Sequence, residues 1–230
     1  MIRRSKNLLY SVFTDFELEK LPWVEHGFGT IASSERWPDW GERAGLKQIH
    51  SSVVVRANGP GLWGDGDALV TNRAGLFVSV RTADCVPILL ADTVNHAVAA
   101  VHSGWRGSAA NIVRETLRVM KREFGTDAAN VYAAIGPCIQ ECCYEVSPEV
   151  ARQFARWIPD LEMVDSQVRL NLVEVNRNQL LQEGVPVVSS NVECTKCNSL
   201  QLHSFRRDGE KAGRLVSAIR LKSSLSIDNV

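Results

Sequence analysis

Two apolar runs that flank a polar joint form the clearest strand pattern in the chain. CVPILLAD begins at Cys85 and AVAAVH ends at His102. Apolar runs of this length, bounded by turn residues, predict two buried strands, the first over about 85–91. A further strand is predicted just before them, over about 76–81, and a loop just after them, at 103–107.

The segment that follows has the period of an amphipathic helix. In residues 108–125 apolar side chains recur at helical spacing, basic residues gather late, and Gly125 stands where a helix ends. Two more helices are predicted over 147–158, where Pro148 follows a serine, and over 172–184, which ends in glycine.

Shorter segments complete the pattern of elements. LKQIHSSVVVRA, residues 46–57, predicts a strand that starts at His50, and the Gly- and Pro-rich residues 57–67 predict a surface loop. VYAAIG and PVVSS predict two more strands. The last apolar segment, 214–221, fits a strand or a helix, because its periodicity does not separate the two.

The order of these elements indicates the fold class. Strands and helices are mixed without strict alternation, which argues against a doubly wound parallel sheet and predicts an α+β fold. We expect one domain that takes in the whole chain, residues 1–230. Its ordered body should run from about residue 8 to residue 223, with a frayed tail after it.

Composition narrows the classes of function. The 230 residues are 45% apolar and 23% charged, with a formal net charge of +0, so no strong field attracts nucleic acid or a membrane surface. The N-terminus starts like a signal peptide, but the charged TDFELEK follows and no cleavage site is seen. A cytoplasmic protein is expected, whose six cysteines do not form a disulfide scaffold.

A thiol and two imidazoles are the first candidates for chemistry. If the two strands around 85–102 are antiparallel, Cys85 and His102 lie side by side, and His50 stands at another strand edge. One cysteine and two histidines suit Zn²⁺ with an open fourth position for water or substrate. On spacing alone, a structural role fits these three residues better than a metal site: Cys85 would be a buried strand residue and the two histidines would be hydrogen-bonded loop residues, because no known zinc motif is present.

Several motifs together resemble a known family. TADCVPILLAD, HSGWRG, IGPCI with CCYEV, NRNQLLQEGV, and SFRRDG with GR occur in this order between about His50 and Leu221. They are similar to the YfiH/YlmD family of laccase-domain proteins, also described as multicopper polyphenol oxidases or peptidoglycan editing factors. The resemblance implies a four-layer α/β/β/α sandwich with mixed sheets. It also implies metal ligands at His50, Cys85 and His102, with zinc expected and copper as an alternative.

The resemblance further implies purine nucleoside chemistry. Members phosphorolyse adenosine, inosine and methylthioadenosine and also deaminate adenosine, so a nucleoside and phosphate are the expected partners, and a homodimer is a family-level expectation. Cys85, His102 and Arg106 are the candidate catalytic residues. Arg106 is the first choice for holding phosphate, ahead of other arginines, namely Arg81, Arg206 and Arg207.

Two carboxylates and the remaining cysteines are not expected to be metal ligands. Asp67 either orients a ligand histidine or caps the loop at 64–67. Asp84 should point away from Cys85 if both lie on a strand, so it is not expected to be a ligand. The other five cysteines, which include a Cys-x-x-Cys, are expected to be buried structural thiols.

Three alternatives remain open. Cys85 and His102 could form a metal-free thiol and imidazole pair that hydrolyses amides in peptidoglycan precursors. A copper-dependent polyphenol oxidase is a second alternative, although five histidines are few for several coppers. The third is a metal-stabilised binding protein without activity, since the N-terminal part is shorter than in most members.

Overall fold

A computed structural model gives the arrangement of the chain. It describes residues 2–4, 11–33, 37–38, 43–159, 167–190 and 193–223. Most of the predicted frayed tail lies outside these ranges.

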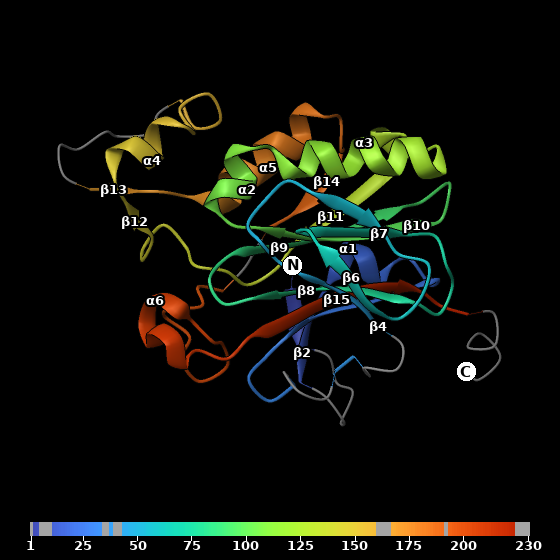
Figure 1. Ribbon diagram of the computed structural model, residues 1–230, viewed down its shortest axis with the longest axis horizontal. Helices are drawn as coiled ribbons and strands as arrows, with labels where there is room; N and C mark the ends of the chain where they lie inside the picture. The colour runs from blue at the N-terminus through green and yellow to red at the C-terminus, as the bar shows by residue number, and fades with distance from the viewer. Residues whose placement is uncertain are drawn as a thin grey trace.

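Two sheets form the body of the molecule (Figure 1). The seven-stranded sheet has the order β1 (Ile2–Arg4), β2 (Val12–Asp15), β3 (Val24–Gly29), β15 (Leu215–Leu221), β8 (Phe77–Thr82), β4 (Arg43–Lys47) and β6 (Gly61–Asp65). The six-stranded sheet has the order β14 (Val187–Ser189), β11 (Val131–Ile135), β9 (Val86–Asp92), β10 (Ala97–Ser103), β7 (Ala68–Thr71) and β5 (Val54–Arg56). Both contain parallel and antiparallel pairs.

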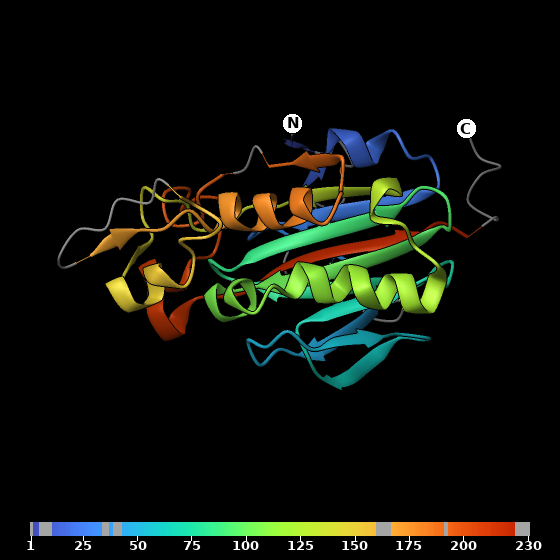
Figure 2. The ribbon, with the colours of Figure 1, turned by 90° about the horizontal axis from the view of Figure 1, so that it is seen from above.

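Helices cover one side and one end of these sheets. The longer helices α3 (Ile112–Phe124) and α5 (Leu172–Gln182) lie side by side over the six-stranded sheet (Figures 1 and 2). Shorter elements occupy the ends and edges, namely α1 (Phe16–Glu19), α2 (Trp105–Ala109), α4 (Pro148–Arg152), α6 (Phe205–Asp208), two 3₁₀ turns (Ala128–Asn130 and Gly209–Lys211) and the small pair β12 (Glu145–Val146) and β13 (Val168–Arg169). None of the helices in the described part of the chain has the length and apolar character needed to cross a membrane.

Alternation along the central strands builds two apolar layers. In β9, Ile88 and Leu90 face the helices, whereas Leu89 and Ala91 face the second sheet. All four are fully buried, as expected for a strand that is covered on both faces. On the outer face of the seven-stranded sheet, Trp37 packs with a smaller apolar cluster. The prediction of an α+β sandwich of mixed sheets with flanking helices is confirmed.

Four predicted elements differ from the structure. Residues 46–57 are not one strand but the end of β4, a loop, and β5 in the other sheet. The loops predicted at 57–67 and 103–107 contain β6 and most of α2. The helix predicted over 147–158 ends at Arg152, after which hydrogen bonds of the i−3 type turn the chain so that aromatic side chains reach the core.

One buried histidine makes stability depend on pH. His26 on β3 accepts a hydrogen bond at Nε2 from the backbone N–H of Asp15, at 2.8 Å, so the ring must be neutral there. Burial lowers the pKa of His26 from 6.5 to about 4, although Asp15 and Glu19 act to raise it. Because the folded pKa lies below the unfolded one, this stability is complete above about pH 6.5 and is lost as the pH falls toward 4.

We therefore expect His26→Gln to flatten the acid side of the stability profile. Between about pH 7 and pH 4, the wild type should lose on the order of 3 kcal/mol more free energy of unfolding than the variant. Urea unfolding at several pH values measures this, and the shared carboxylates cancel in the difference. Parallel profiles for the two proteins would contradict the assignment.

Candidate active site and metal centre

The β9–β10 hairpin brings Cys85 and His102 together. The strands are antiparallel, with Pro87 opposite His102 and Val86 opposite Ser103. Cys85 directly precedes β9 and so lies at the end of the hairpin where β10 finishes. The predicted antiparallel pairing is confirmed.

Asp67 fixes the third member of the cluster, His50. The loop after β4 is held on the Asp67 carboxylate, which accepts hydrogen bonds from the backbone N–H of His50 at 3.0 Å and from the N–H and hydroxyl of Ser51 at 2.6 and 2.7 Å. His50 has a φ of 58°, in the left-handed region that residues other than glycine rarely adopt. Local strain of this kind is commonly found at functional sites.

The same carboxylate orients His102. Nδ1 of His102 lies 2.8 Å from Oδ1 of Asp67, and both side chains are buried. With Nδ1–H donated to Asp67, Nε2 of His102 is the ring nitrogen left to serve as a ligand or base. Of the two roles considered for Asp67, the structure therefore shows the orienting contact, and the loop it holds is 49–51.

Three potential ligand atoms meet at this point. The ring nitrogens of His50 and His102 and the sulfur of Cys85 all lie within 4.8 Å of one another. The two imidazole rings meet edge to face, with centroids 4.9 Å apart. Gly104 permits this packing, because a Cβ there would lie 3.0 Å from the Cys85 sulfur and 3.2 Å from the His50 ring.

Electrostatics favour an ionised thiol. Burial raises the pKa of the Cys85 thiol, but hydrogen bonds from His102 and His50 outweigh it and bring the pKa to about 6. Burial lowers the pKa of His102, whereas Asp67 and Cys85 raise it to about 9. Burial also opposes ionisation of Asp67, yet the bonds from His102 and Ser51 bring its pKa to about 2.

The donor set fits a metal ion. A thiolate and two imidazoles are the ligands that Zn²⁺ and Cu²⁺ prefer, and all three side chains border one cavity. A fourth coordination position would therefore face the cavity rather than the protein interior. That arrangement is typical of catalytic rather than structural metal sites.

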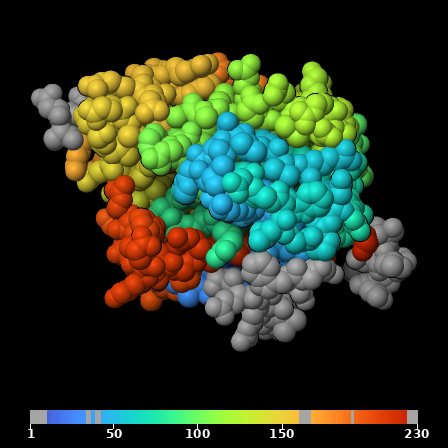
Figure 3. All heavy atoms as spheres, viewed as in Figure 1, coloured from blue at the N-terminus to red at the C-terminus, as the bar shows by residue number. Residues whose placement is uncertain are grey.

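The cavity beside the cluster has a volume of about 600 Å³, within the range of small-molecule sites. In the space-filling view the surface is hollowed between the red α6 segment and the cyan residues after β4 (Figure 3). Its lining combines the three potential ligands with polar, cationic and apolar groups, namely Leu46, Lys47, Gln48, Arg81, Ala83, Asp84, Ile139, Tyr144, Phe205, Arg206 and Arg214.

The arginines considered from the sequence lie in different places. Arg81 and Arg206 line the cavity. Arg214, the arginine of the GR motif, also lines it, although it was not predicted as a site residue. Arg207 instead pairs with Asp208 and donates to the carbonyl of Thr195. Arg106 is outside the cavity lining, with its guanidinium stacked 4.4 Å over Trp105, and its catalytic role stays a prediction.

Asp84 is a structural anchor of the cavity wall. It has a φ of 89° and accepts hydrogen bonds from the Thr195 hydroxyl and the Arg206 backbone N–H, both at 2.6 Å. These bonds attach α6 and the turn before it to the residue next to Cys85. Sequence reasoning missed this role, because the partners are more than a hundred positions away.

Asp67→Asn should weaken metal binding at this cluster by about 10- to 100-fold. The amide nitrogen would meet N–H donors where the carboxylate now accepts, so the tautomer of His102 or the loop at His50 must change. Competition with a chromogenic zinc chelator measures the affinity. Asp65→Asn is the matched control, since the Asp65 side chain is 56% exposed and lies 3.5 Å from Lys47. Equal affinities in both variants would contradict the role given to Asp67.

The chain is similar in sequence and in fold to several known proteins. A family model described as multi-copper polyphenol oxidoreductase laccase matches residues 32–222. A purine nucleoside phosphorylase of Clostridium acetobutylicum is 36% identical over 198 residues, which cover 85% of this chain and 84% of the relative. Adenosine deaminase RL5, from an unknown prokaryotic organism, is 34% identical over 68% of this chain and 62% of its own. The crystal structure of the hypothetical protein YfiH from Bacillus licheniformis superposes with a TM-score of 0.84 at 26% identity, covering 96% of this chain and 99% of the other.

Proposed function

Because this chain belongs to the multi-copper polyphenol oxidoreductase laccase family, in which relatives bear the names purine nucleoside phosphorylase and adenosine deaminase, we propose that it is a purine nucleoside phosphorylase that also deaminates adenosine. The observation that carries the proposal is one cavity that joins the His50, Cys85 and His102 cluster to three arginines. We propose that the whole chain acts as a single catalytic domain.

The cluster is the proposed zinc site. His50, Cys85 and His102 would hold the ion, and Asp67 would keep His102 in the tautomer that presents Nε2. Zinc bound there would supply a Lewis acid that lowers the pKa of water toward neutrality, as deamination requires. Deamination adds water to C6 of adenosine and releases ammonia, which gives inosine.

The apolar and aromatic part of the wall suits a purine. Ile139, Tyr144 and Phe205 border the cavity, and flat aromatic surfaces favour stacking with a base. Burial raises the pKa of Tyr144 to about 12, so its hydroxyl stays protonated at neutral pH. It can donate a hydrogen bond to the nucleoside.

The cationic part of the wall suits phosphate. Arg81, Arg206 and Arg214 border the same cavity, and arginine binds phosphate oxygens in a bidentate manner. In phosphorolysis a phosphate oxygen bonds to C1′ of the ribose while the bond from C1′ to the purine nitrogen breaks. The purine nitrogen keeps that electron pair and takes a proton, and the products are the free base and ribose 1-phosphate.

The histidines favour this chemistry over a multicopper oxidase. The cluster contains two of the five histidines of the chain, His50 and His102. His26 accepts a hydrogen bond from the Asp15 backbone, His96 is stacked on Trp23, and the His203 ring packs against Gly213. Dioxygen reduction by several coppers needs more imidazoles in one place than these residues bring together.

The compartment and partners follow from the same proposal. A nucleoside and inorganic phosphate are the proposed partners. None of the six cysteines is joined in a disulfide, which is usual in a reducing cytoplasm. We therefore propose a cytoplasmic location.

The test is product analysis with the zinc-loaded protein. Adenosine with phosphate should yield adenine and ribose 1-phosphate, and adenosine without phosphate should yield inosine and ammonia. Chromatography separates these products. Formation of neither adenine nor inosine would refute the proposal, and oxidation of a phenol with uptake of dioxygen would favour the polyphenol oxidase.

A further inference from the structure

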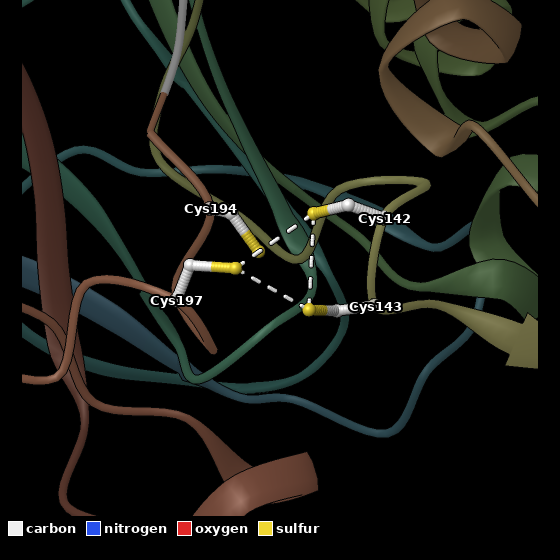
Figure 4. Close-up of side chains that lie close together, drawn as sticks. All are labelled: Cys142, Cys143, Cys194 and Cys197. Atoms are coloured by element: carbon white, nitrogen blue, oxygen red, sulfur yellow. Dashed lines mark hydrogen bonds between the residues drawn. The ribbon is translucent and has the colours of Figure 1, made fainter.

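Four cysteines outside the cavity point at one another. Cys142 and Cys143 lie in the turn between β11 and β12, and Cys194 and Cys197 lie in the Cys-Thr-Lys-Cys turn before α6. Figure 4 shows that the four sulfurs converge from these two segments. All four lie within 4.8 Å of one another. The expectation of buried structural thiols holds for Cys194 but is wrong for Cys142 and Cys197, which are exposed, and for Cys143, which is half-buried.

The spacing of the sulfurs is that of ligands around a common ion. Sulfur separations are 3.4 Å between Cys143 and Cys197, 3.7 Å between Cys142 and Cys143, and 3.8 Å between Cys142 and Cys197. A tetrahedral zinc with bonds of about 2.3 Å places its sulfurs about 3.8 Å apart. A disulfide would require about 2.05 Å.

Backbone hydrogen bonds hold both turns independently of the sulfurs. In the first turn, the N–H of Cys143 and of Tyr144 donate to the carbonyl of Gln140, at 2.9 and 3.0 Å. In the second, the N–H of Asn198 donates to the carbonyl of Cys194 at 2.9 Å.

The two turns are also joined to each other and to the core. The N–H of Thr195 donates to the carbonyl of Cys138 at 3.0 Å, and the Arg207 guanidinium donates to the Thr195 carbonyl at 2.8 Å. The four sulfurs therefore stand on a frame that is already positioned, which lowers the ordering cost of binding an ion.

We propose that Cys142, Cys143, Cys194 and Cys197 form a tetrathiolate zinc site, separate from the cluster in the cavity, that fastens the turn after β11 to the turn before α6. Four thiolates complete the tetrahedron and leave no position open, so the site is structural. Zinc suits it because four sulfur ligands select zinc over the hard cations.

The position of this site gives it a role in shaping the cavity. Tyr144 follows Cys143 directly, and Arg206 donates to the carbonyl of Glu145 at 3.1 Å and lies over the Tyr144 ring. The opposite turn is anchored through Thr195 to Asp84. Loss of the ion should therefore loosen the wall that carries Tyr144 and Arg206 and raise the KM for the nucleoside more than it lowers kcat; this consequence rests on the proposed function, whereas the tetrathiolate site itself does not.

Metal counting tests the site directly. Elemental analysis of protein purified without a metal-affinity tag should give about two zinc ions per chain in the wild type and about one in Cys197→Ser, in Cys142→Ser and in His102→Ala. Cys138→Ala, a buried cysteine outside the cluster, should keep about two and is the matched control. Equal zinc in the wild type and Cys197→Ser, or iron in place of zinc, would overturn the proposal.

A second measurement uses the wild-type protein, so its result does not depend on whether the cysteine variants fold. Wild-type protein loaded with Co²⁺ should show the strong sulfur-to-cobalt charge-transfer absorption of four thiolates, and His102→Ala should keep it. Its absence, together with a mass decrease corresponding to disulfide formation, would show that the cluster is oxidised rather than metal-bound. None of these readouts needs a substrate, so they stand even if the protein proves inactive on nucleosides.

Discussion

His102→Ala is expected to lose the zinc of the cavity and to reduce phosphorolysis and deamination by at least about 1,000-fold. The side chain supplies one of three potential ligands, and its ring is bound directly by the Asp67 carboxylate. Its removal leaves two ligands, too few to retain zinc against a chelator. Zinc content and the rates of adenine and inosine formation, measured on the same preparations, check the result.

The control is another histidine of the same protein. His96 is exposed and stacked on Trp23, with ring centroids 4.4 Å apart, and it is not among the cavity residues. His96→Ala should keep the zinc content and both activities. Full activity in His102→Ala would sink the assignment of the site. Circular dichroism of each variant separates loss of chemistry from loss of fold.

The metal content of the wild type also decides between the two readings of Cys85. Zinc in the cavity protects the thiol, because a bound thiolate is slow to alkylate. A wild type without zinc, with Cys85 open to alkylation and amide hydrolysis lost on alkylation, would support the thiol and imidazole hydrolase instead.

Local pattern was enough to predict the part of the site that one hairpin builds. Apolar runs of strand length on either side of a turn fix both strands, and antiparallel pairing then places Cys85 beside His102. The helix α3 was predicted for a similar reason, since the helical spacing of its apolar residues and its end at Gly125 are both local signals.

Tertiary contacts explain where the pattern misled. The run Val53–Val55 looks like the continuation of a strand through His50, yet the loop between β4 and β5 crosses from one sheet to the other. The Asp67 carboxylate, sixteen to eighteen positions away, shapes this loop by accepting hydrogen bonds from its backbone N–H groups. A single sequence does not show such a contact.

Burial explains the structure of two further segments. Residues 215–221 form a strand between β3 and β8 and are covered on both faces, so the apolar residues show no clear alternation. Beyond Arg152, the helix stops because Phe154 and Trp157 are both drawn into the core. The cysteine cluster was not predicted because its two halves are more than fifty positions apart in the sequence and meet only in the folded chain.

Neutralising the cavity arginines should separate the two proposed reactions. Arg81→Gln, Arg206→Gln and Arg214→Gln are each expected to raise the KM for phosphate by about 10- to 100-fold, because each removes a charged hydrogen-bond donor. Deamination consumes water and no phosphate, so the rate of inosine formation without phosphate should change far less. Initial rates over a range of phosphate concentrations, beside rates in its absence, measure both effects.

The same series weighs Arg106, the first choice from the sequence, against the arginines of the cavity. Arg106 is exposed and held over Trp105, so Arg106→Gln should leave the KM for phosphate close to that of Arg118→Gln, a substitution on the exposed side of α3. Phosphate must reach C1′ of a nucleoside that lies in the cavity, and a guanidinium outside the lining cannot hold it there. A large rise in KM for Arg106→Gln, with none for the three cavity variants, would place the anion on the α2 side of the cluster and overturn this arrangement.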